Sequence, residues 1–195
     1  MPIHQQKHFH LSFAEYEVLE ASAEEGVRYE FFDGTVYAMS GGSMNHNEIV
    51  QNCSQHLREI FRASGCWVFA ENVKVQVAKN KKYVYPDVVV TCSKEDRQDG
   101  KIIKDPVIIV EVLSDSTASK DLMAKVIAYQ ALSGLKAYII ISQEDCWIRI
   151  YERDNQGQWA PHRHLTDLKE TLTIAGMIGE IPVNWIYEGI DFEED

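Results

Sequence analysis

An acidic residue stands inside one of the most apolar stretches of the chain. Glu111 lies within the aliphatic run Pro106–Leu113, which predicts a strand buried on both faces. Burying an ionised carboxylate costs several kcal/mol unless a cation, a metal ion or hydrogen-bond donors neutralise it. Asp87, directly after Pro86 and ahead of three valines, poses the same problem at the start of another predicted strand. Two such carboxylates on adjacent strands would form an oxygen-rich pocket suited to Mg²⁺ or Mn²⁺.

The segment after Glu111 supplies a cation. A helix is predicted from near Ser119 to Gly134, with an apolar arc formed by Leu122, Met123, Val126 and Ile127. Lys125 and Tyr129 lie one turn apart on one border of that arc. From there both side chains can reach back toward the strand that carries Glu111.

Two structural alternatives stay open at this point. In the first, Glu111 pairs with a basic side chain and Asp87 caps a turn, with no role in chemistry. In the second, Asp121 and Lys125 form an exposed ion pair at i,i+4 spacing, worth a few tenths of a kcal/mol.

Two helices are predicted ahead of these residues. Ser12 and Glu15 form a capping box, which predicts a helix from Phe13 to about Ala23. After Gly41-Gly42, apolar residues at helical spacing predict a second helix that ends before Gly65. Its apolar stripe consists of Ile49, Val50, Cys53, Leu57, Ile60 and Phe61.

The remaining segments predict a sheet. Asp33-Gly34 is a strong signal for a hairpin between residues 28–32 and 35–39. Further strands are expected at Trp67–Val77, the three valines after Asp87, Pro106–Leu113, Ala137–Ile141 and Trp147–Tyr151. Because a helix separates the strand at Glu111 from the next strand, these two are predicted to lie parallel, joined by a right-handed crossover.

Composition narrows the classes of function. The 195 residues predict one domain spanning residues 1–195, with a loose arm at 1–10 and a solvated acidic tail at 191–195. The net charge of −11 opposes indiscriminate attraction to polyphosphate, so any binding of nucleic acid must be local. No apolar run approaches the roughly 20 residues of a membrane span. Since the N-terminus does not read as a signal peptide, a cytoplasmic location is predicted.

The cysteines indicate no metal cage. Cys53, Cys66, Cys92 and Cys146 are scattered without a Cys-x-x-Cys pair, which argues against a zinc site and a disulfide framework. Buried free thiols are therefore expected. Nucleophilic hydrolysis and nucleotide binding are set aside, because the chain has no Gly-x-Ser-x-Gly elbow and Gly41-Gly42 fits neither a P-loop nor a dinucleotide motif.

A series of short motifs along the chain carries a family resemblance. They are Tyr29-Glu30, Asp33-Gly34, His46, Pro86-Asp87-Val88, Pro106, Glu111-Val112-Leu113-Ser114, Asp121, Lys125, Tyr129 and Tyr138. In this order they resemble the Uma-two family of restriction-endonuclease-like proteins, within the PD-(D/E)XK nuclease superfamily. The resemblance covers most of the chain, from about Phe13 to Tyr151.

The resemblance implies a fold and a site. The fold is α/β (α+β), of the restriction-endonuclease type, with a mixed central sheet flanked by helices. Asp87 and Glu111 would bind Mg²⁺ or Mn²⁺, and Glu30 would be an accessory acid that contacts the ion through water. The chain departs from the superfamily pattern at Leu113, where a lysine is expected two residues after the acid. We therefore expect Lys125 to supply the positive group from the following helix.

The implied function is that of a metal-dependent endonuclease-like phosphodiesterase acting on DNA, with water activated by the divalent ion. Lys125 would orient that water or stabilise developing charge, and Tyr129 would hydrogen-bond Lys125 or the phosphate. His46 is expected to be an ordinary polar residue of a first helical turn. A rival of another class stays open: a catalytically silent nuclease-fold module that binds nucleic acid or a protein partner, which Leu113 favours.

DNA binding is predicted to be weak and salt-sensitive. Candidate phosphate contacts fall in two predicted loops, at Lys79, Lys81, Lys82, Lys94, Arg97, Lys101 and Lys104. Solvated loop charge is the alternative explanation for both groups. A homodimer is also predicted, because two symmetric sites suit the cutting of two antiparallel strands.

Overall fold

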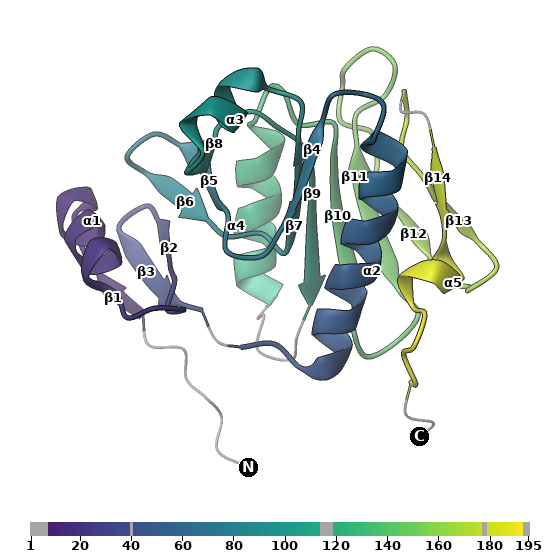
Figure 1. The fold of residues 1–195 in the computed structure, drawn as a ribbon, viewed down its shortest axis with the longest axis horizontal. Coiled ribbons are helices and arrows are strands. Elements are labelled where there is room, and N and C mark those ends of the chain that lie inside the picture. Colours follow the sequence, from purple (N-terminus) through teal and green to yellow (C-terminus); the bar gives the residue numbers. More distant parts are fainter. Residues whose placement is uncertain (1–7, 40, 114–118, 177–178, 193–195) are drawn as a thin grey trace.

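Two six-stranded sheets organise the chain in the computed structural model, which describes residues 8–39, 41–113, 119–176 and 179–192 (Figure 1). The first sheet has the order β1 (His8–His10), β3 (Thr35–Ala38), β2 (Tyr29–Phe32), β6 (Lys82–Val84), β5 (Lys74–Ala78) and β8 (Ile102–Ile103). The second has the order β12 (Arg163–Leu165), β11 (Ile148–Glu152), β10 (Ala137–Ser142), β9 (Pro106–Leu113), β7 (Val88–Thr91) and β4 (Trp67–Ala70). The mixed α+β class is confirmed, but the strands divide between two sheets.

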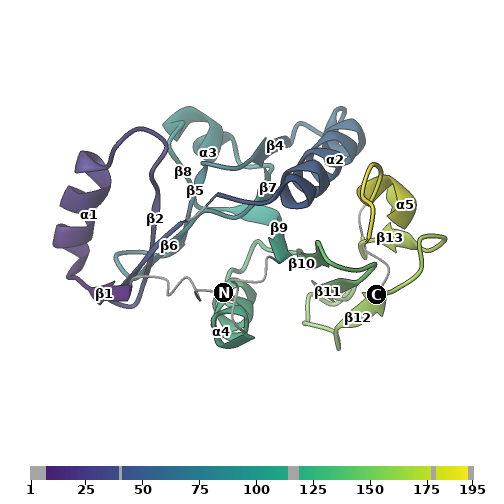
Figure 2. The same cartoon turned by 90° about the horizontal axis from the view of Figure 1, so that it is seen from below.

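Helices cover the second sheet on both faces (Figure 2). One face packs on α2 (Met44–Phe61), α5 (Val183–Ile186) and the hairpin of β13 (Thr171–Thr173) and β14 (Glu180–Pro182). The other face packs on α4 (Ser119–Gln130). The first sheet packs on α1 (Phe13–Ser22), and α3 (Lys94–Asp99) follows β7. No helix in the described ranges is long and apolar enough to cross a membrane.

The local signals of the first helix and hairpin are confirmed. Ser12 Oγ accepts a hydrogen bond from the Glu15 amide at 3.3 Å, and Glu15 Oε2 accepts one from the Ser12 amide at 2.8 Å. Asp33 and Gly34 have φ angles of 48° and 93°, as a two-residue turn between β2 and β3 requires. The apolar stripe of α2 also faces the second sheet, as predicted.

The register of the second sheet positions the acidic residues. Strand β9 pairs antiparallel with β7 and parallel with β10, so the predicted parallel crossover through α4 is confirmed. The pair Val88↔Val110 puts Asp87 opposite Glu111, and Ile140 of β10 is the partner of Glu111 on the other side. Because residues opposed across a ladder share a face, Asp87 and Glu111 belong to the face on which α4 packs.

Three segments differ from the sequence-based predictions. Residues His8–His10 are not part of a loose arm, since they pair with β3 as strand β1. The segment Trp67–Val77 is split between the two sheets, because Glu71 and Asn72 turn the chain with φ angles of 50° and 55°. Residues Lys94–Asp99 form α3, capped by Ser93, where a loop was predicted. Residues 1–7 of the predicted arm and 193–195 of the predicted tail lie outside the described ranges.

Helix α4 is rotated relative to its predicted apolar arc. Met123 and Ile127 are 53% and 66% exposed, whereas Val126 and Tyr129 are buried. In this orientation Lys125 points inward to the carboxylates described below. The predicted arc is therefore wrong for Met123 and Ile127, while Lys125 and Tyr129, predicted on its border, face inward.

Cys66 and Cys92 form a disulfide, so the prediction of free thiols is wrong for these two residues. The antiparallel pair Trp67↔Thr91 puts the two cysteines opposite each other, just beyond the last paired residues of β4 and β7. Cys53 and Cys146 are free, as predicted. Cysteine spacing along the chain does not reveal a pair that strand register creates.

Reduction of this disulfide is expected to lower the free energy of unfolding by about 3.5 kcal/mol, because the unfolded chain regains the loop-closure entropy of the linked segment. The two cysteines are 26 residues apart. Urea unfolding with and without dithiothreitol measures the effect. A Cys66→Ala/Cys92→Ala variant is the control, since reductant should leave its stability unchanged. Equal stability of the reduced and oxidised wild-type chain would contradict the prediction.

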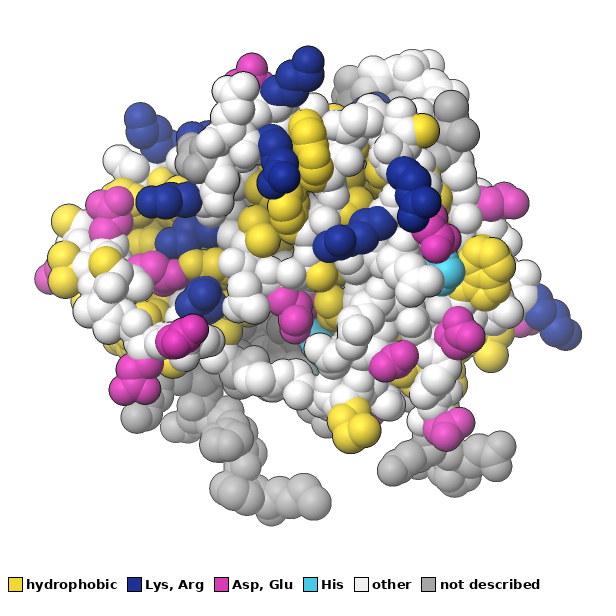
Figure 3. All heavy atoms as spheres, in the orientation of Figure 1, with side chains coloured by type: hydrophobic (Ala, Val, Ile, Leu, Met, Phe, Trp, Pro, Cys, Tyr) yellow, Lys and Arg dark blue, Asp and Glu magenta, His cyan; other side chains and the backbone are white. Residues whose placement is uncertain are grey.

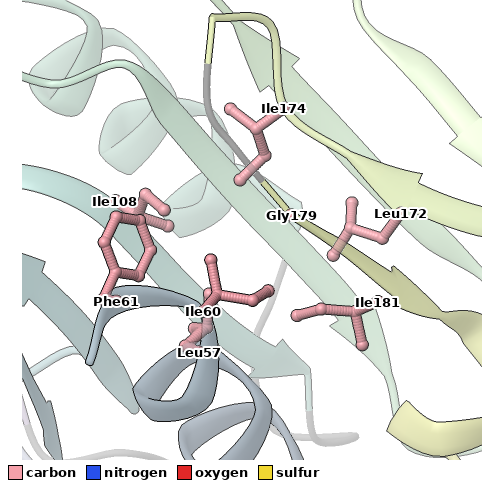
Figure 4. Close-up of a pocket in the computed structure, with 8 residues that line it drawn as sticks. All are labelled: Leu57, Ile60, Phe61, Ile108, Leu172, Ile174, Gly179 and Ile181. Carbon is pink, nitrogen blue, oxygen red and sulfur yellow. The ribbon is translucent and has the colours of Figure 1, made fainter. Parts of the chain in front are cut away.

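A small apolar cavity lies between the end of α2 and the β13–β14 hairpin (Figure 4). Leu57, Ile60 and Phe61 of α2 face Leu172, Ile174 and Ile181 across it. Because the lining offers hydrocarbon surface and no charged group, this cavity belongs to the core of the α2 side and is separate from the acidic site.

Candidate active site

Three carboxylates from both sheets meet where the sheets adjoin. Glu30 comes from β2, Asp87 precedes β7, and Glu111 lies near the end of β9. Their side chains are only 13%, 13% and 12% exposed. Asp87 belongs to the link from β6 to β7, and the amide of Tyr85 in the same link donates to Glu30 Oε1 at 3.1 Å. Three carboxylates held together out of water require cations or hydrogen-bond donors.

Helix α4 provides the cation and one further donor. Lys125 Nζ lies 3.1 Å from Glu30 Oε1 and 3.1 Å from Glu111 Oε1. The Tyr129 hydroxyl donates to Glu111 Oε1 at 2.8 Å. The predicted approach of both side chains to the strand is therefore confirmed, and Lys125 pairs with strand acids from two sheets. The side chain of Asp121 and the motif residue Ser114 lie outside the described part of the structure.

Asp87 is held by β9 and by α2. Its Oδ2 accepts a hydrogen bond from the Val112 amide at 2.6 Å, and its Oδ1 lies 3.3 Å from His46 Nε2. Ser43 caps α2 and accepts from the His46 amide at 3.0 Å, which fixes the first turn of the helix. Asp87 is thus bound to the strand of Glu111, not to a local turn. The sequence predicted only an ordinary polar residue at His46, because its contact with Asp87 depends on how α2 packs.

The electrostatics show an excess of negative charge. Burial raises the pKa of Glu111, and the charges of Asp87 and Glu30 raise it further, against the opposing effects of Lys125 and Tyr129. Burial lowers the pKa of Lys125, but Glu111 and Glu30 more than offset this and hold it above its ordinary value. The hydrogen bond to Asp87 raises the pKa of His46, against the effect of burial. The Lys125 ammonium therefore pairs with both Glu30 and Glu111, and the carboxylates of the cluster also repel one another.

A buried hydroxyl faces this cluster without a partner. Tyr138 of β10 is fully buried, and its hydroxyl makes no hydrogen bond within the described residues. Burial and the charges of Glu111 and Glu30 raise its pKa, so the hydroxyl keeps its proton and can donate. Its ring packs edge-on against Tyr129, with centroids 4.8 Å apart. The sequence pointed to Tyr138 as part of the motif series but gave it no role.

Loss of the side-chain hydroxyl is expected to change the free energy of unfolding in opposite directions at Tyr129 and Tyr138. Tyr138→Phe should raise the free energy of unfolding by about 1 kcal/mol, since it removes an unsatisfied buried donor. Tyr129→Phe should lower it by about 2 kcal/mol, since it removes a hydrogen bond to a carboxylate. Urea unfolding in metal-free buffer measures both. Destabilisation of equal size in the two variants would contradict this assignment.

The donor chemistry fits a hard divalent cation. Mg²⁺ is commonly held by one or two carboxylates, with water and phosphate completing its shell. Asp87 and Glu111, opposed on neighbouring strands, could supply that pair, and the excess of carboxylates over cations favours a further positive charge there. Within the described ranges, no three His, Cys, Asp or Glu side chains form a complete ligand group. The role of Glu30 as a water-mediated ligand stays a prediction.

The lysine groups proposed to contact phosphate lie in two places. Lys82 is 3.1 Å from Asp33 Oδ2, beside the turn of the first hairpin. Lys94 and Arg97 belong to α3, which follows β7 at the end opposite to Asp87. Figure 3 shows Lys and Arg side chains spread across the upper half of that face, without a single patch. Contact of these residues with nucleic acid stays a prediction.

The paired carboxylates, the inward lysine and the helix-flanked mixed sheet define a protein of the restriction-endonuclease-like class. Comparison with a solved structure supports the fold: a crystal structure described as "a putative nuclease belonging to DUF820 from Anabaena variabilis" superposes with a TM-score of 0.73. The match covers 91% of this chain and 97% of that one at 13% sequence identity, so it bears on the fold alone.

Sequence comparison then gives the family. The Uma2 family model, described as "Putative restriction endonuclease", matches residues 13–179, and the chain belongs to this family. Two relatives come from Synechocystis sp. (strain PCC 6803). "Uncharacterized protein slr1290" is 31% identical over 90% of this chain and 92% of its own length. "Uncharacterized protein sll1609" is 30% identical over 76% of this chain and 84% of its own length. The resemblance drawn from the motifs is confirmed.

Proposed function

We propose that the chain is a divalent-metal-dependent endonuclease that hydrolyses phosphodiester bonds in DNA. The observation that carries this proposal is the position of Lys125, whose Nζ lies 3.1 Å from acidic oxygens of both sheets. Position 113 is leucine, so a helix residue takes the place of the strand lysine that the superfamily pattern has there. Carboxylates for a metal ion and an ammonium for a phosphate are thereby gathered in one cluster.

Each residue has a distinct part in the proposed reaction. Asp87 and Glu111 would hold Mg²⁺ or Mn²⁺, which when bound would polarise the phosphate and lower the pKa of the attacking water. The water oxygen would bond to phosphorus and release its proton to solvent while the phosphorus–oxygen bond to the leaving strand breaks, and the leaving oxygen would take up a proton from solvent. Lys125 would stabilise the negative charge that develops on the phosphate oxygens. Glu30 and the Tyr129 hydroxyl would keep the Lys125–Glu111 pair in place.

His46 and Tyr138, which had no assigned role in the sequence analysis, have one in the proposed reaction. His46 would orient the Asp87 carboxylate, since its Nε2 lies 3.3 Å from Asp87 Oδ1 while the other oxygen binds the β9 backbone. Tyr138 would donate its unused hydrogen bond to the water or to a phosphate oxygen. Substrate binding would then satisfy the donor that is unsatisfied in the free protein.

Nicking of supercoiled plasmid DNA tests the proposal. The wild-type chain should nick with Mg²⁺ or Mn²⁺ and not with EDTA, and Asp87→Asn should remove the activity. Glu17→Gln, which neutralises an exposed carboxylate of α1, is the matched control and should nick as the wild type does. Nicking that persists in EDTA, or in Asp87→Asn, would contradict the proposal.

The silent nuclease-fold module is the second candidate. It is favoured by the contacts of Lys125 with Glu30 and Glu111 and by the Tyr129–Glu111 hydrogen bond, which a structural role alone would explain. Calorimetry with Mn²⁺ separates the two candidates. The endonuclease should bind Mn²⁺ and Asp87→Ala should not, whereas absence of binding to both chains would favour the silent module.

DNA as the partner and a homodimer as the working form are part of the proposal. Affinity for DNA should fall steeply with salt, because phosphate contacts release counterions.

The homodimer is tested by light scattering after size exclusion, which measures the mass of the free protein. A mass near twice the 22.3 kDa of one chain is expected.

A further inference from the structure

The face of the second sheet next to α4 carries a set of rings beside the acidic cluster. Arg149 and Tyr151 of β11 alternate with Trp147, which directly precedes that strand, and His164 of β12 alternates with His162, which directly precedes β12. We call these five residues the aromatic row. Register ties the row to the site, because Glu111 pairs with Ile140, Ile140 with Arg149, and Arg149 with His164. Residues opposed across neighbouring strands share a face, so the row and Glu111 lie on one surface of the sheet.

The rings form a continuous series that leads to the site. Centroids are 5.2 Å apart for Trp147 and His164, 5.2 Å for His164 and His162, and 5.3 Å for His162 and Tyr151. Tyr151 then stacks on Tyr138 at 6.0 Å, and Tyr138 is the ring with the unsatisfied hydroxyl next to the carboxylates. The exposed part of the row thus begins where the buried site ends.

Arg149 is the charged member of the row. Its guanidinium lies over the Trp147 ring, 4.7 Å from the centroid, and its Nε donates to His164 Nε2 at 3.2 Å. In the described part of the chain no carboxylate lies within ion-pair distance of Arg149, in contrast to Arg163 of the neighbouring strand, which pairs with Glu152 at 2.8 Å. A cation without an acidic partner is notable in a chain with a net charge of −11.

The row is open to a ligand. His162 and His164 are exposed, and Trp147 and Arg149 are half-buried. Figure 2 shows α4 lying under β9 and β10, while β11 and β12 extend beyond it toward the edge of the sheet. Strands are about 4.8 Å apart, so Arg149 is about 10 Å and His164 about 14 Å from Glu111 along the sheet.

We propose that the aromatic row binds an unpaired segment of the nucleic acid strand that passes through the active site. Bases would stack on the His162, His164 and Trp147 rings, and a phosphate would pair with Arg149. Stacking needs open base faces, which a duplex hides within its own stack, so the row favours single strands or frayed ends over blunt duplex. The proposal rests on the proposed function, because it assigns the row a part of the same substrate.

Fluorescence anisotropy with labelled oligothymidylate in EDTA tests the row without any cleavage. The wild-type chain should bind oligothymidylate more tightly than a blunt duplex of the same length. Arg149→Gln/His164→Ala should weaken that binding at least about tenfold, the loss expected for one stacked base. Arg62→Gln/His56→Ala is the matched control, since it removes the same two residue types from α2 and its C-cap on the other face of the sheet. Its affinity should equal that of the wild type.

The outcomes separate the row from the nuclease proposal. Wild-type affinity in Arg149→Gln/His164→Ala, equal loss in the α2 control, tighter binding of blunt duplex, or no binding by the wild type would each overturn the row. His162→Ala, at another exposed residue of the row, gives a second test and should weaken binding as well. Plasmid nicking is measured on the same proteins. If the wild-type chain binds oligothymidylate through the row but does not nick plasmid, the row proposal is supported and the nuclease proposal is refuted. If the wild-type chain nicks plasmid and Arg149→Gln/His164→Ala binds oligothymidylate as the wild type does, the nuclease proposal is supported and the row proposal is refuted.

Discussion

Glu111→Gln should lower metal-dependent nicking of plasmid DNA by at least about 1,000-fold, the size of effect seen when one main electrostatic group of a site is lost. Glu111 is the residue at which the site converges. It faces Asp87 across the strand pair, and it accepts hydrogen bonds from both Lys125 and Tyr129. Removing its charge should weaken the metal site and release Lys125 toward Glu30 alone.

Glutamine makes this substitution a test of charge, because it keeps the shape of the side chain and an oxygen that accepts from Tyr129. The variant should fold as well as the wild type, since its neutral amide is no longer repelled by Asp87 and Glu30. Calorimetry should show weaker Mn²⁺ binding, and urea unfolding should show stability equal or higher. If Glu111→Gln nicked plasmid DNA as fast as the wild type, the proposed role of Glu111 in metal binding and catalysis would be refuted, whatever the other variants showed.

Parts of this fold follow from residues that are close in sequence. Ser12 and Glu15 sit three positions apart, and Asp33 and Gly34 are adjacent, so the cap and the turn are encoded locally and were predicted correctly. Glu111 was informative for a similar reason. Its aliphatic neighbours make burial certain within a short window, and a buried acid implies a partner.

Other contacts depend on packing that no local pattern encodes. His46 reaches Asp87 only because α2 lies across the start of β7, and Cys66 meets Cys92 only because β4 and β7 pair in one register. The rotation of α4 is the clearest case. Periodicity placed Met123 and Ile127 inward, but in the structure both are exposed and Lys125 contacts the buried carboxylates. A buried cluster of charged groups is thus associated with a departure from the apolar pattern of the helix that contributes to it.

Lys125→Met should destabilise the metal-free chain by about 3–5 kcal/mol, the cost of removing one partner from a buried ion pair. The methionine fills similar space, so the loss comes from charge and not from a cavity. Glu30 and Glu111, at 13% and 12% exposure, are left without their ammonium and next to Asp87. Urea unfolding in EDTA measures the change. Lys125→Arg, which keeps the charge, should lose much less.

A divalent ion should reverse this loss if it binds where the carboxylates converge. Mn²⁺ should therefore raise the stability of Lys125→Met by more than that of the wild type, because the added charge replaces the missing one and ligand binding adds to the free energy of unfolding. Lys125→Met/Glu30→Gln should recover part of the stability without metal. It should not recover nicking, since no ammonium remains to meet the phosphate. If Mn²⁺ stabilised Lys125→Met and the wild type equally, the metal ion would not bind beside Lys125. The ion pairs of Lys125 would then have a structural role only.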